Sequence, residues 1–142
     1  MSDLPYTTDV LRLAAEANGA GRLPPPCLTH TEHNPACGDR STVDLQVENG
    51  VVVAIAHDTR ACVLSQASAS ILGAAMGGRP VAELVSLRNA VQSMLQGAGP
   101  GPGGTFARYR YLADVASHPG RHRCVLLPID AALKALKGSE PG

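Results

Sequence analysis

The sequence predicts an α+β fold in which a small antiparallel sheet packs under several helices. The first sign is a hairpin, because residues 42–48 alternate between polar and apolar side chains and the β-branched run 51–56 follows Asn49–Gly50. Asn-Gly favours a two-residue type I′ turn. Apolar side chains then recur at helical spacing both before and after this hairpin, which is an α+β arrangement.

The hairpin strands are expected at Thr42–Glu48 and Val51–Ala56. On the first strand the inward face is expected to hold Val43, Leu45 and Val47. The second strand is apolar enough to be covered on both faces. A third strand is possible, but no other turn signal places it.

Four helices are expected from apolar spacing. The first ends at Asn18–Gly19, and the extended connector Leu23–Pro26 follows it. The second follows Cys62, and the third starts at Pro80, a residue suited to a first helical turn. Their inward faces are expected to hold Val10, Leu11, Ala14 and Ala17, then Leu64, Ala67, Ile71, Leu72 and Ala75, then Val81, Leu84, Leu87, Val91 and Leu95.

The last helix is expected to begin close to Val125, because proline is tolerated only near a helix start and Pro128 follows. Its spacing predicts an Asp130–Lys134 ion pair. The chain as a whole, residues 1–142, is expected to form one domain. The glycine- and proline-rich stretch 97–104 is expected to be a flexible surface loop.

The composition argues against nucleic-acid and membrane functions. Twelve basic residues balance twelve acidic ones, and only three tyrosines and one phenylalanine could stack on bases. The longest apolar run is too short to cross a bilayer, and the amino terminus has no leader pattern. We therefore expect a cytoplasmic protein. In that reducing compartment, cysteines serve metal or sulfur chemistry more often than disulfides.

Three widely spaced cysteines and one aspartate are the chemically most informative residues. Cys37 precedes Asp39 in the run Asn34-Pro35-Ala36-Cys37-Gly38-Asp39, while Cys62 and Cys124 lie at expected element boundaries. Thiolates combined with a carboxylate suit zinc or iron. The alternative is that all three cysteines are simply small buried hydrophobes. Their place at expected element ends favours a metal site over this alternative. Asp39 is a candidate oxygen ligand, although aspartate beside glycine more commonly serves a turn or a cap.

These motifs resemble those of the U-type iron-sulfur cluster assembly proteins, namely IscU, the NifU amino-terminal domain and SufU. The resemblance rests on the Cys37 run, on Ala61-Cys62 leading into Ser65-Gln66-Ala67-Ser68-Ala69-Ser70, and on Arg121-His122-Arg123-Cys124. It covers roughly Tyr6 to Leu136. It implies an α+β fold whose site (Cys37, Asp39, Cys62 and Cys124) holds zinc or a nascent cluster.

Two features place the chain nearest the SufU-like branch. Cys62 and Cys124 are far apart, and Arg123 stands where IscU-like chains have a histidine. Likeness to SufU implies a zinc site and a SufS-like cysteine desulfurase as partner. Cys37 would then accept persulfide sulfur, and Arg121 would stabilise the thiolate or the docked partner. His122 could be a displaced ligand, although a partly exposed, pH-sensitive side chain is the simpler interpretation.

The alternative within the family is a scaffold that assembles a [2Fe-2S] cluster, or holds iron, on Cys37, Cys62 and Cys124, and passes the cluster to downstream assembly or acceptor proteins. Two interpretations come from outside the family. One is a structural zinc domain, although Cys-x2-Cys spacing is absent. The other is a cysteine-nucleophile enzyme using Cys37 with His30 or His33, although these histidines are expected in a solvated loop. Cys27 matches no motif of the family.

Overall fold

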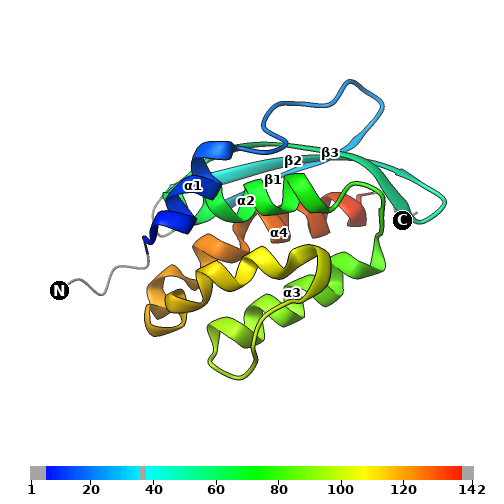
Figure 1. Ribbon diagram of the computed structural model, residues 1–142. Coiled ribbons are helices and arrows are strands. Elements are labelled where there is room, and N and C mark those ends of the chain that lie inside the picture. The colour runs from blue at the N-terminus through cyan, green and yellow to red at the C-terminus, as the bar shows by residue number, and fades with distance from the viewer. Residues whose placement is uncertain (1–5, 36–37, 139–142) are drawn as a thin grey trace.

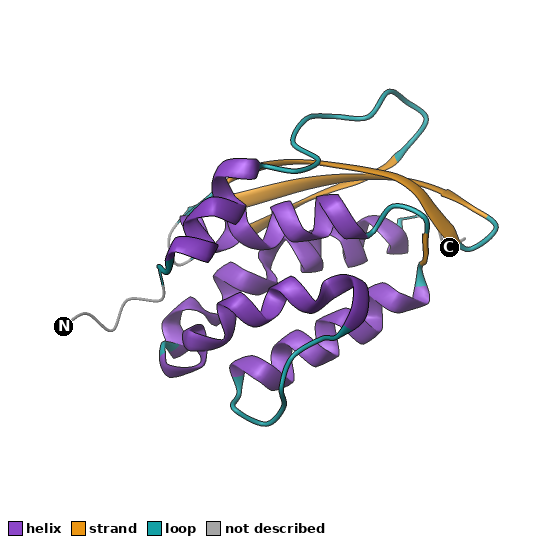
Figure 2. Ribbon diagram, viewed as in Figure 1, coloured by secondary structure: helices purple, strands orange, loops and turns teal. Residues whose placement is uncertain are grey.

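The structure is a computed structural model that describes residues 6–35 and 38–138. Its sheet is antiparallel with the order β1-β2-β3-β4, and helices cover one face of it (Figures 1 and 2). The elements in chain order are α1 (Thr8–Glu16), β1 (Leu28–Asn34), β2 (Asp39–Glu48), β3 (Val51–Arg60), α2 (Val63–Ala75), β4 (Arg79–Pro80), α3 (Ala82–Leu95), the 3₁₀ segments η1 (Gly104–Ser117) and η2 (Pro119–Arg121), and α4 (His122–Lys137).

The core lies between the sheet and two helices. α4 packs against β1 and β2, and α2 packs against β3. α3 and η1 form a further layer on the side away from the sheet (Figure 1). Fully buried side chains from the sheet meet those of α2 and α4, among them Val43, Leu45, Leu64, Ile71 and Ile129. This α+β architecture confirms the fold class that the sequence predicts.

The hairpin is present and longer than predicted. Asn49 and Gly50 both have positive φ, 52° and 77°, as a type I′ turn requires. A bulge between Gln46 and Val47 shifts the register of β2 and β3. The expectation that Val51–Ala56 is covered on both faces is wrong, because Val53 is 44% exposed on the uncovered side of the sheet.

Several predicted elements need correction at their ends. The third strand is β1, so the interpretation of His30 and His33 as residues of a solvated loop is wrong. Pro80 lies in β4 rather than in the first turn of α3. Leu11 is 48% exposed, and Leu13 takes its place on the buried face of α1. No helix or strand is assigned between Gln96 and Gly103, whereas Gly104 starts η1.

η1 is a helix that the apolar spacing could have revealed. Its buried side chains are Phe106, Tyr109, Leu112 and Val115, which recur at every third residue. A 3₁₀-helix has three residues per turn, so this spacing places all four on one side. The usual search for a period of 3.6 residues overlooks such a pattern.

The connector after α1 crosses the uncovered face of the sheet (Figure 1). Ala20 forms a bridge with His57 at the edge of β3, and the chain then passes over β2. There Arg22 binds the fully buried carboxylate of Asp44 through Nε and Nη2, at 2.6 and 3.1 Å. Burial opposes ionisation of Asp44, but the Arg22 bonds prevail and hold its pKa below the ordinary value.

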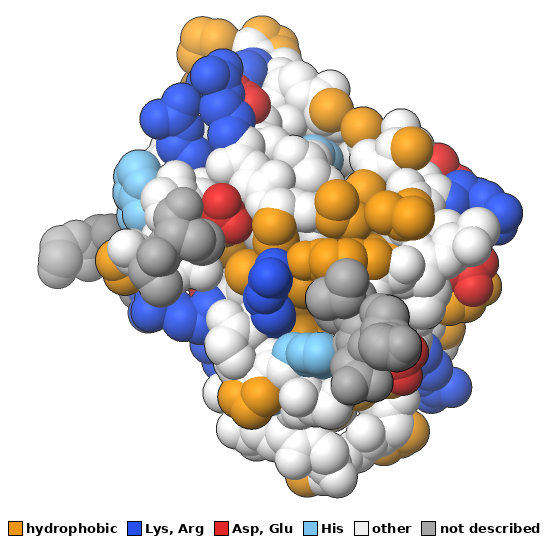
Figure 3. Space-filling view, turned by 90° about the vertical axis from the view of Figure 1, so that its left-hand side faces the viewer, with side chains coloured by type: hydrophobic (Ala, Val, Ile, Leu, Met, Phe, Trp, Pro, Cys, Tyr) orange, Lys and Arg blue, Asp and Glu red, His pale blue; other side chains and the backbone are white. Residues whose placement is uncertain are grey.

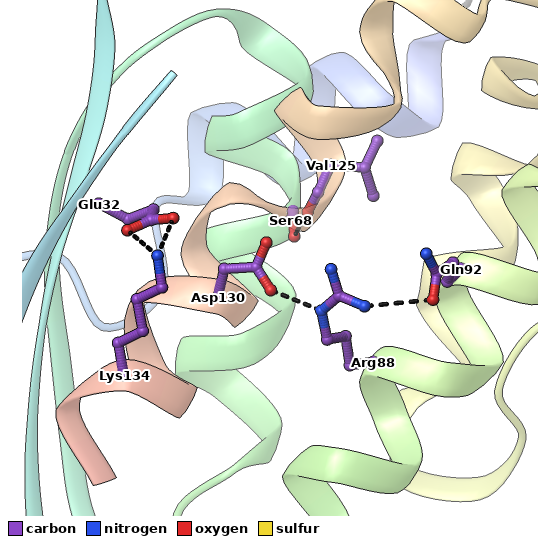
Figure 4. Close-up of polar contacts among 7 residues, drawn as sticks. All are labelled: Glu32, Ser68, Arg88, Gln92, Val125, Asp130 and Lys134. Carbon is purple, nitrogen blue, oxygen red and sulfur yellow. Dashed lines mark hydrogen bonds and ion pairs between the residues drawn. The ribbon is translucent and has the colours of Figure 1, made fainter. Parts of the chain in front are cut away.

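The predicted Asp130–Lys134 ion pair is wrong, because both side chains pair with other elements (Figure 4). Arg88 of α3 donates to Asp130 Oδ1 at 2.6 Å, and its Nη1 bonds Gln92 at 3.1 Å. Lys134 Nζ reaches both carboxylate oxygens of Glu32 on β1, at 2.9 and 2.7 Å. Two ion pairs therefore tie α4 to α3 and to the sheet.

Burial of His57 predicts a pH-dependent stability. Its Nε2 lies 3.0 Å from the Asn18 carbonyl and its Nδ1 lies 3.0 Å from Thr59 Oγ1, so the neutral ring is fully paired. Burial lowers the pKa of His57 below its ordinary value. The unfolded chain therefore protonates this histidine more readily than the folded chain does. The stability that neutral His57 contributes is complete above the unfolded pKa of about 6.5 and is lost as pH falls below it.

Urea unfolding of metal-free protein with and without His57→Gln would test this. We expect the unfolding free energy of the wild type to fall more steeply between pH 7.5 and pH 5 than that of the variant. The difference between the two profiles isolates His57 from the other titrating groups. Parallel profiles would contradict the assignment of this pH dependence to His57.

In residues 6–35 and 38–138, every helix is too short or too polar to cross a lipid bilayer.

Candidate metal centre

Three of the four predicted ligands come from different elements and converge at one end of the molecule. Asp39 opens β2, Cys62 is the N-cap residue of α2, and Cys124 lies in the first turn of α4. One carboxylate oxygen and the two sulfurs lie within 4.8 Å of one another. We call these three residues the Asp/Cys/Cys group. Cys124 is buried and the other two are half-buried, so the group is reachable from solvent.

The fourth predicted ligand, Cys37, lies outside the described residues. Its neighbour Gly38 is described and has φ +74°, a left-handed conformation that favours glycine. The Gly38 N–H also donates to the Asn34 carbonyl at 3.0 Å, which links the residue before β2 to the end of β1. Glycine at this position beside Asp39 therefore has a backbone reason.

Hydrogen bonds hold the group together. The Cys62 N–H donates to Asp39 Oδ2 at 3.2 Å, which joins the start of β2 to the start of α2. Ser65, one turn further along α2, donates from Oγ to the Cys124 carbonyl at 2.7 Å. The same Oγ lies 3.9 Å from Cys62 Sγ. Ser65 has no role in the predicted site, although its place three residues after Cys62 on a helix indicates that the two side chains lie close together.

The electrostatic setting favours thiolate at Cys62. A hydrogen bond from the Cys124 thiol is the main cause that lowers the pKa of Cys62 to about 6, against the opposing effect of burial. The backbone N–H groups of Ser65 and Leu64, at the start of α2, act in the same direction. A deprotonated sulfur beside a carboxylate is ready to coordinate a metal cation.

The last helix begins earlier than predicted. It starts at His122 rather than near Val125, and it continues through Pro128. The expectation that Cys124 lies at the amino-terminal end of this helix holds, since it is the third helical residue. His122 Nε2 faces the carbonyl oxygens of Val115 and Ala116 at 3.1 and 3.3 Å, so this nitrogen carries the proton and ties α4 to η1.

The other predicted site residues lie in other settings. Arg121 is exposed, donates from Nη1 to the Tyr6 hydroxyl at 2.7 Å and lies 6.0 Å from the centre of that ring. His30 contacts Glu32 at 3.2 Å, and His33 lies opposite Arg40 in the sheet. Cys27, just before β1, is half-buried and is not part of the Asp/Cys/Cys group.

The donor set fits a zinc or iron ion. Two sulfurs and one carboxylate oxygen are ligands that zinc accepts at a tetrahedral site, and thiolates also bind iron. The Cys62 N–H uses one lone pair of Asp39 Oδ2, and the other lone pairs of this carboxylate stay available to a cation. On this end of the molecule an apolar area lies near the centre of the face, with both basic and acidic side chains around it (Figure 3).

Comparison with known families gives a match to the NifU-like N terminal domain over residues 5–124, which includes the whole Asp/Cys/Cys group. The chain belongs to the NifU-like N-terminal domain family. The resemblance that the cysteine motifs suggest is therefore confirmed.

Curated relatives of this NifU-like domain carry both names that the motifs suggest. The iron-sulfur cluster assembly scaffold protein IscU of Thermotoga maritima is 30% identical over 132 residues, or 93% of this chain and 92% of the relative. The zinc-dependent sulfurtransferase SufU of Bacillus subtilis is 26% identical over 110 residues, or 78% of this chain and 75% of the relative.

Solved structures show the same architecture. A NifU-like protein (N-terminal) from Brucella abortus superposes with a TM-score of 0.89 at 33% identity, covering 95% of this chain and 96% of that one. A SufU-type scaffold from Fervidobacterium islandicum gives a TM-score of 0.81 at 20% identity, covering 96% and 99%, and so shares the fold. The NifU-like fold of this chain is therefore shown independently of its motifs.

Proposed function

We propose that this chain is an iron-sulfur cluster assembly protein of the IscU/SufU type that accepts sulfur from a cysteine desulfurase at a zinc centre. The observation that carries the proposal is the convergence of Asp39, Cys62 and Cys124 within 4.8 Å. With Cys37 as the fourth ligand, the set would have three sulfurs and one oxygen, which matches the number and kinds of ligand that zinc takes in proteins. Arg123, which precedes Cys124 in place of a histidine, leaves the carboxylate as the only hard ligand.

Zinc, when bound, would supply the positive charge that keeps the coordinating sulfurs deprotonated. In the proposed transfer, the Cys37 thiolate attacks the outer sulfur of a persulfide on the desulfurase. A new S–S bond forms on Cys37 while the partner's S–S bond breaks. The electron pair leaves with the partner's cysteine sulfur as a thiolate, so no external oxidant or reductant is consumed.

Other residues would guide the encounter. Asp39 stays hydrogen-bonded to the Cys62 N–H, so it can hold the site while a cysteine ligand is exchanged. Arg121 is exposed and bound to Tyr6, which supports a role in contacting the docked partner more than a role in stabilising thiolate. The product, sulfur carried on a cysteine, would then pass to downstream iron-sulfur assembly or acceptor proteins.

The alternative function is a scaffold for a [2Fe-2S] cluster on Cys37, Cys62 and Cys124. The specific observation in its favour is that the Thermotoga relative, which covers 93% of this chain, is called an assembly scaffold. In this case iron and sulfide are cargo, and Asp39 would keep the cluster labile enough to be passed on. Partners would again include a desulfurase that supplies the sulfide.

The two functions predict opposite results for Asp39→Ala. If the chain is a zinc-dependent sulfur acceptor, the variant loses zinc and activates the desulfurase less, because one ligand is missing. If it is a scaffold, the variant retains its cluster longer. Elemental analysis of anaerobically purified protein measures the bound zinc, iron and sulfide. A desulfurase assay with and without the chain measures the activation.

Asp58→Ala is the matched control, because that carboxylate lies on β3, pairs with Arg60 and is 43% exposed. One zinc per chain and strong desulfurase activation in the wild type would support the sulfur-acceptor proposal. Iron with acid-labile sulfide and no activation would favour the scaffold. If Asp39→Ala behaves like Asp58→Ala in both assays, Asp39 does not belong to the site.

A further inference from the structure

Pro128 leaves a gap in the hydrogen bonding of α4 at one of the metal ligands. In a helix the N–H of residue 128 would donate to the carbonyl of residue 124, but proline has no N–H. Pro128 lies inside α4, and residue 124 is Cys124. The Cys124 carbonyl instead accepts a hydrogen bond of 2.7 Å from Ser65 Oγ. A side chain of α2 therefore replaces a backbone bond of α4.

Ser65 is placed to act on both cysteines of the group. Its side chain is fully buried between α2 and α4. While its hydroxyl proton is directed to the Cys124 carbonyl, its oxygen lies 3.9 Å from Cys62 Sγ. Cys62 is in turn bound through its N–H to Asp39. All three members of the Asp/Cys/Cys group are thus connected through a single hydroxyl group and one backbone N–H.

We propose that Ser65 is a positioning residue of the metal centre, which fixes the first turn of α4 against the first turn of α2 and so sets the separation of Cys62 and Cys124. This inference rests on the proposed function, because it concerns the same centre. Buried side chains that orient metal ligands commonly contribute to metal affinity although they do not touch the metal. Ser65 acts in this way through the backbone of one ligand and the sulfur of the other.

Ser68 provides a matched control one turn further along α2. Its Oγ donates to the Val125 carbonyl at 2.7 Å, so it also ties α2 to α4 (Figure 4). Ser68 is fully buried as well. The two carbonyls differ in one respect. The residue four positions after Val125 is Ile129, which has an N–H, whereas the residue four positions after Cys124 is Pro128, which has none. Ser68 also hydrogen-bonds the Tyr109 hydroxyl rather than a cysteine.

The first experiment compares the zinc affinities of the wild type, Ser65→Ala and Ser68→Ala by competition with a chelator. We expect Ser65→Ala to weaken zinc binding by about 10-fold or more, as loss of a ligand-orienting partner commonly does. Ser68→Ala should stay close to the wild type. The visible spectrum of the cobalt-substituted proteins gives a second readout, since sulfur-to-cobalt bands change when ligand positions change.

The double variant Ser65→Ala/Pro128→Ala separates positioning from folding. Its residue 128 has an N–H again, so the Cys124 carbonyl regains a partner within α4 and thermal stability should return. Zinc affinity should stay low, because no side chain then links the two helices at the cysteines. This variant also provides the test if Ser65→Ala alone does not fold.

Three results would overturn the inference. If zinc affinity returns together with stability in the double variant, Ser65 only replaces a missing backbone hydrogen bond and does not position the ligands. Equal zinc affinities of the wild type and Ser65→Ala would remove its role while leaving the proposed centre intact. A wild-type chain that binds no zinc would overturn the proposed zinc function and this inference with it.

Discussion

Cys62→Ser is expected to reduce zinc affinity by more than about 100-fold, because even the loss of a partner that only orients a ligand costs about 10–100-fold. The change should leave the fold intact. Cys62 is the N-cap residue of α2, and serine is among the residues that favour this position. A soft thiolate would be replaced by a hydroxyl, which zinc sites in proteins seldom use. Chelator competition measures the loss, and circular dichroism checks the fold.

Cys27→Ser is the control for this prediction. Cys27 is a half-buried cysteine that lies just before β1, and it is not part of the Asp/Cys/Cys group. The Cys27→Ser protein should therefore keep the zinc affinity of the wild type. A normal zinc content in Cys62→Ser would show that the metal is bound elsewhere. A loss of zinc in Cys27→Ser as large as that in Cys62→Ser would show the same.

Gly73→Ala is expected to destabilise the fold by about 2 kcal/mol, the usual range for an atom forced into a filled site. An added Cβ at Gly73 would overlap the backbone carbonyl oxygen of Asn18 and lie 3.1 Å from Gly19 Cα. The usual gain of about 1 kcal/mol for alanine over glycine inside a helix is too small to offset this. The Asn18 carbonyl also faces His57 Nε2, so its displacement disturbs a second buried contact.

Gly77→Ala serves as the comparison, because an added Cβ there meets nothing within 4 Å. Its effect on the unfolding free energy should lie within about 0.5 kcal/mol, as is usual for surface changes. Urea unfolding of the two variants at one pH measures the difference. Equal stabilities would show that the backbones of Asn18 and Gly73 are not in close contact.

Much of the fold could be predicted because it rests on local patterns. The Asn49–Gly50 turn, the alternation of β2 and the apolar face of α2 depend on residues a few positions apart. The candidate ligands could be named from the sequence too, since thiol and carboxylate chemistry belongs to the residues themselves. The family that these short motifs suggest is confirmed by the domain match over residues 5–124.

Elements without a local signal were missed or misplaced. β1 is half-buried along most of its length, carries His30 and His33, and is recognisable as a strand only by its pairing with β2. α4 begins before Pro128 by more than one turn, and the Cys124 carbonyl accepts from Ser65 in place of the backbone donor that proline lacks. That compensation comes from a residue 59 positions away along the chain.

The sequence by itself determined the fold class, the family and the candidate site residues, because turn chemistry, periodicity and side-chain type depend on short stretches of chain. Only the tertiary structure decided which groups meet. Lys134 binds Glu32, 102 positions away, rather than Asp130 on its own helix. Asp39, Cys62 and Cys124 come within 4.8 Å although they belong to three elements. Such pairings depend on how helix faces pack on strands, and residue spacing does not specify this.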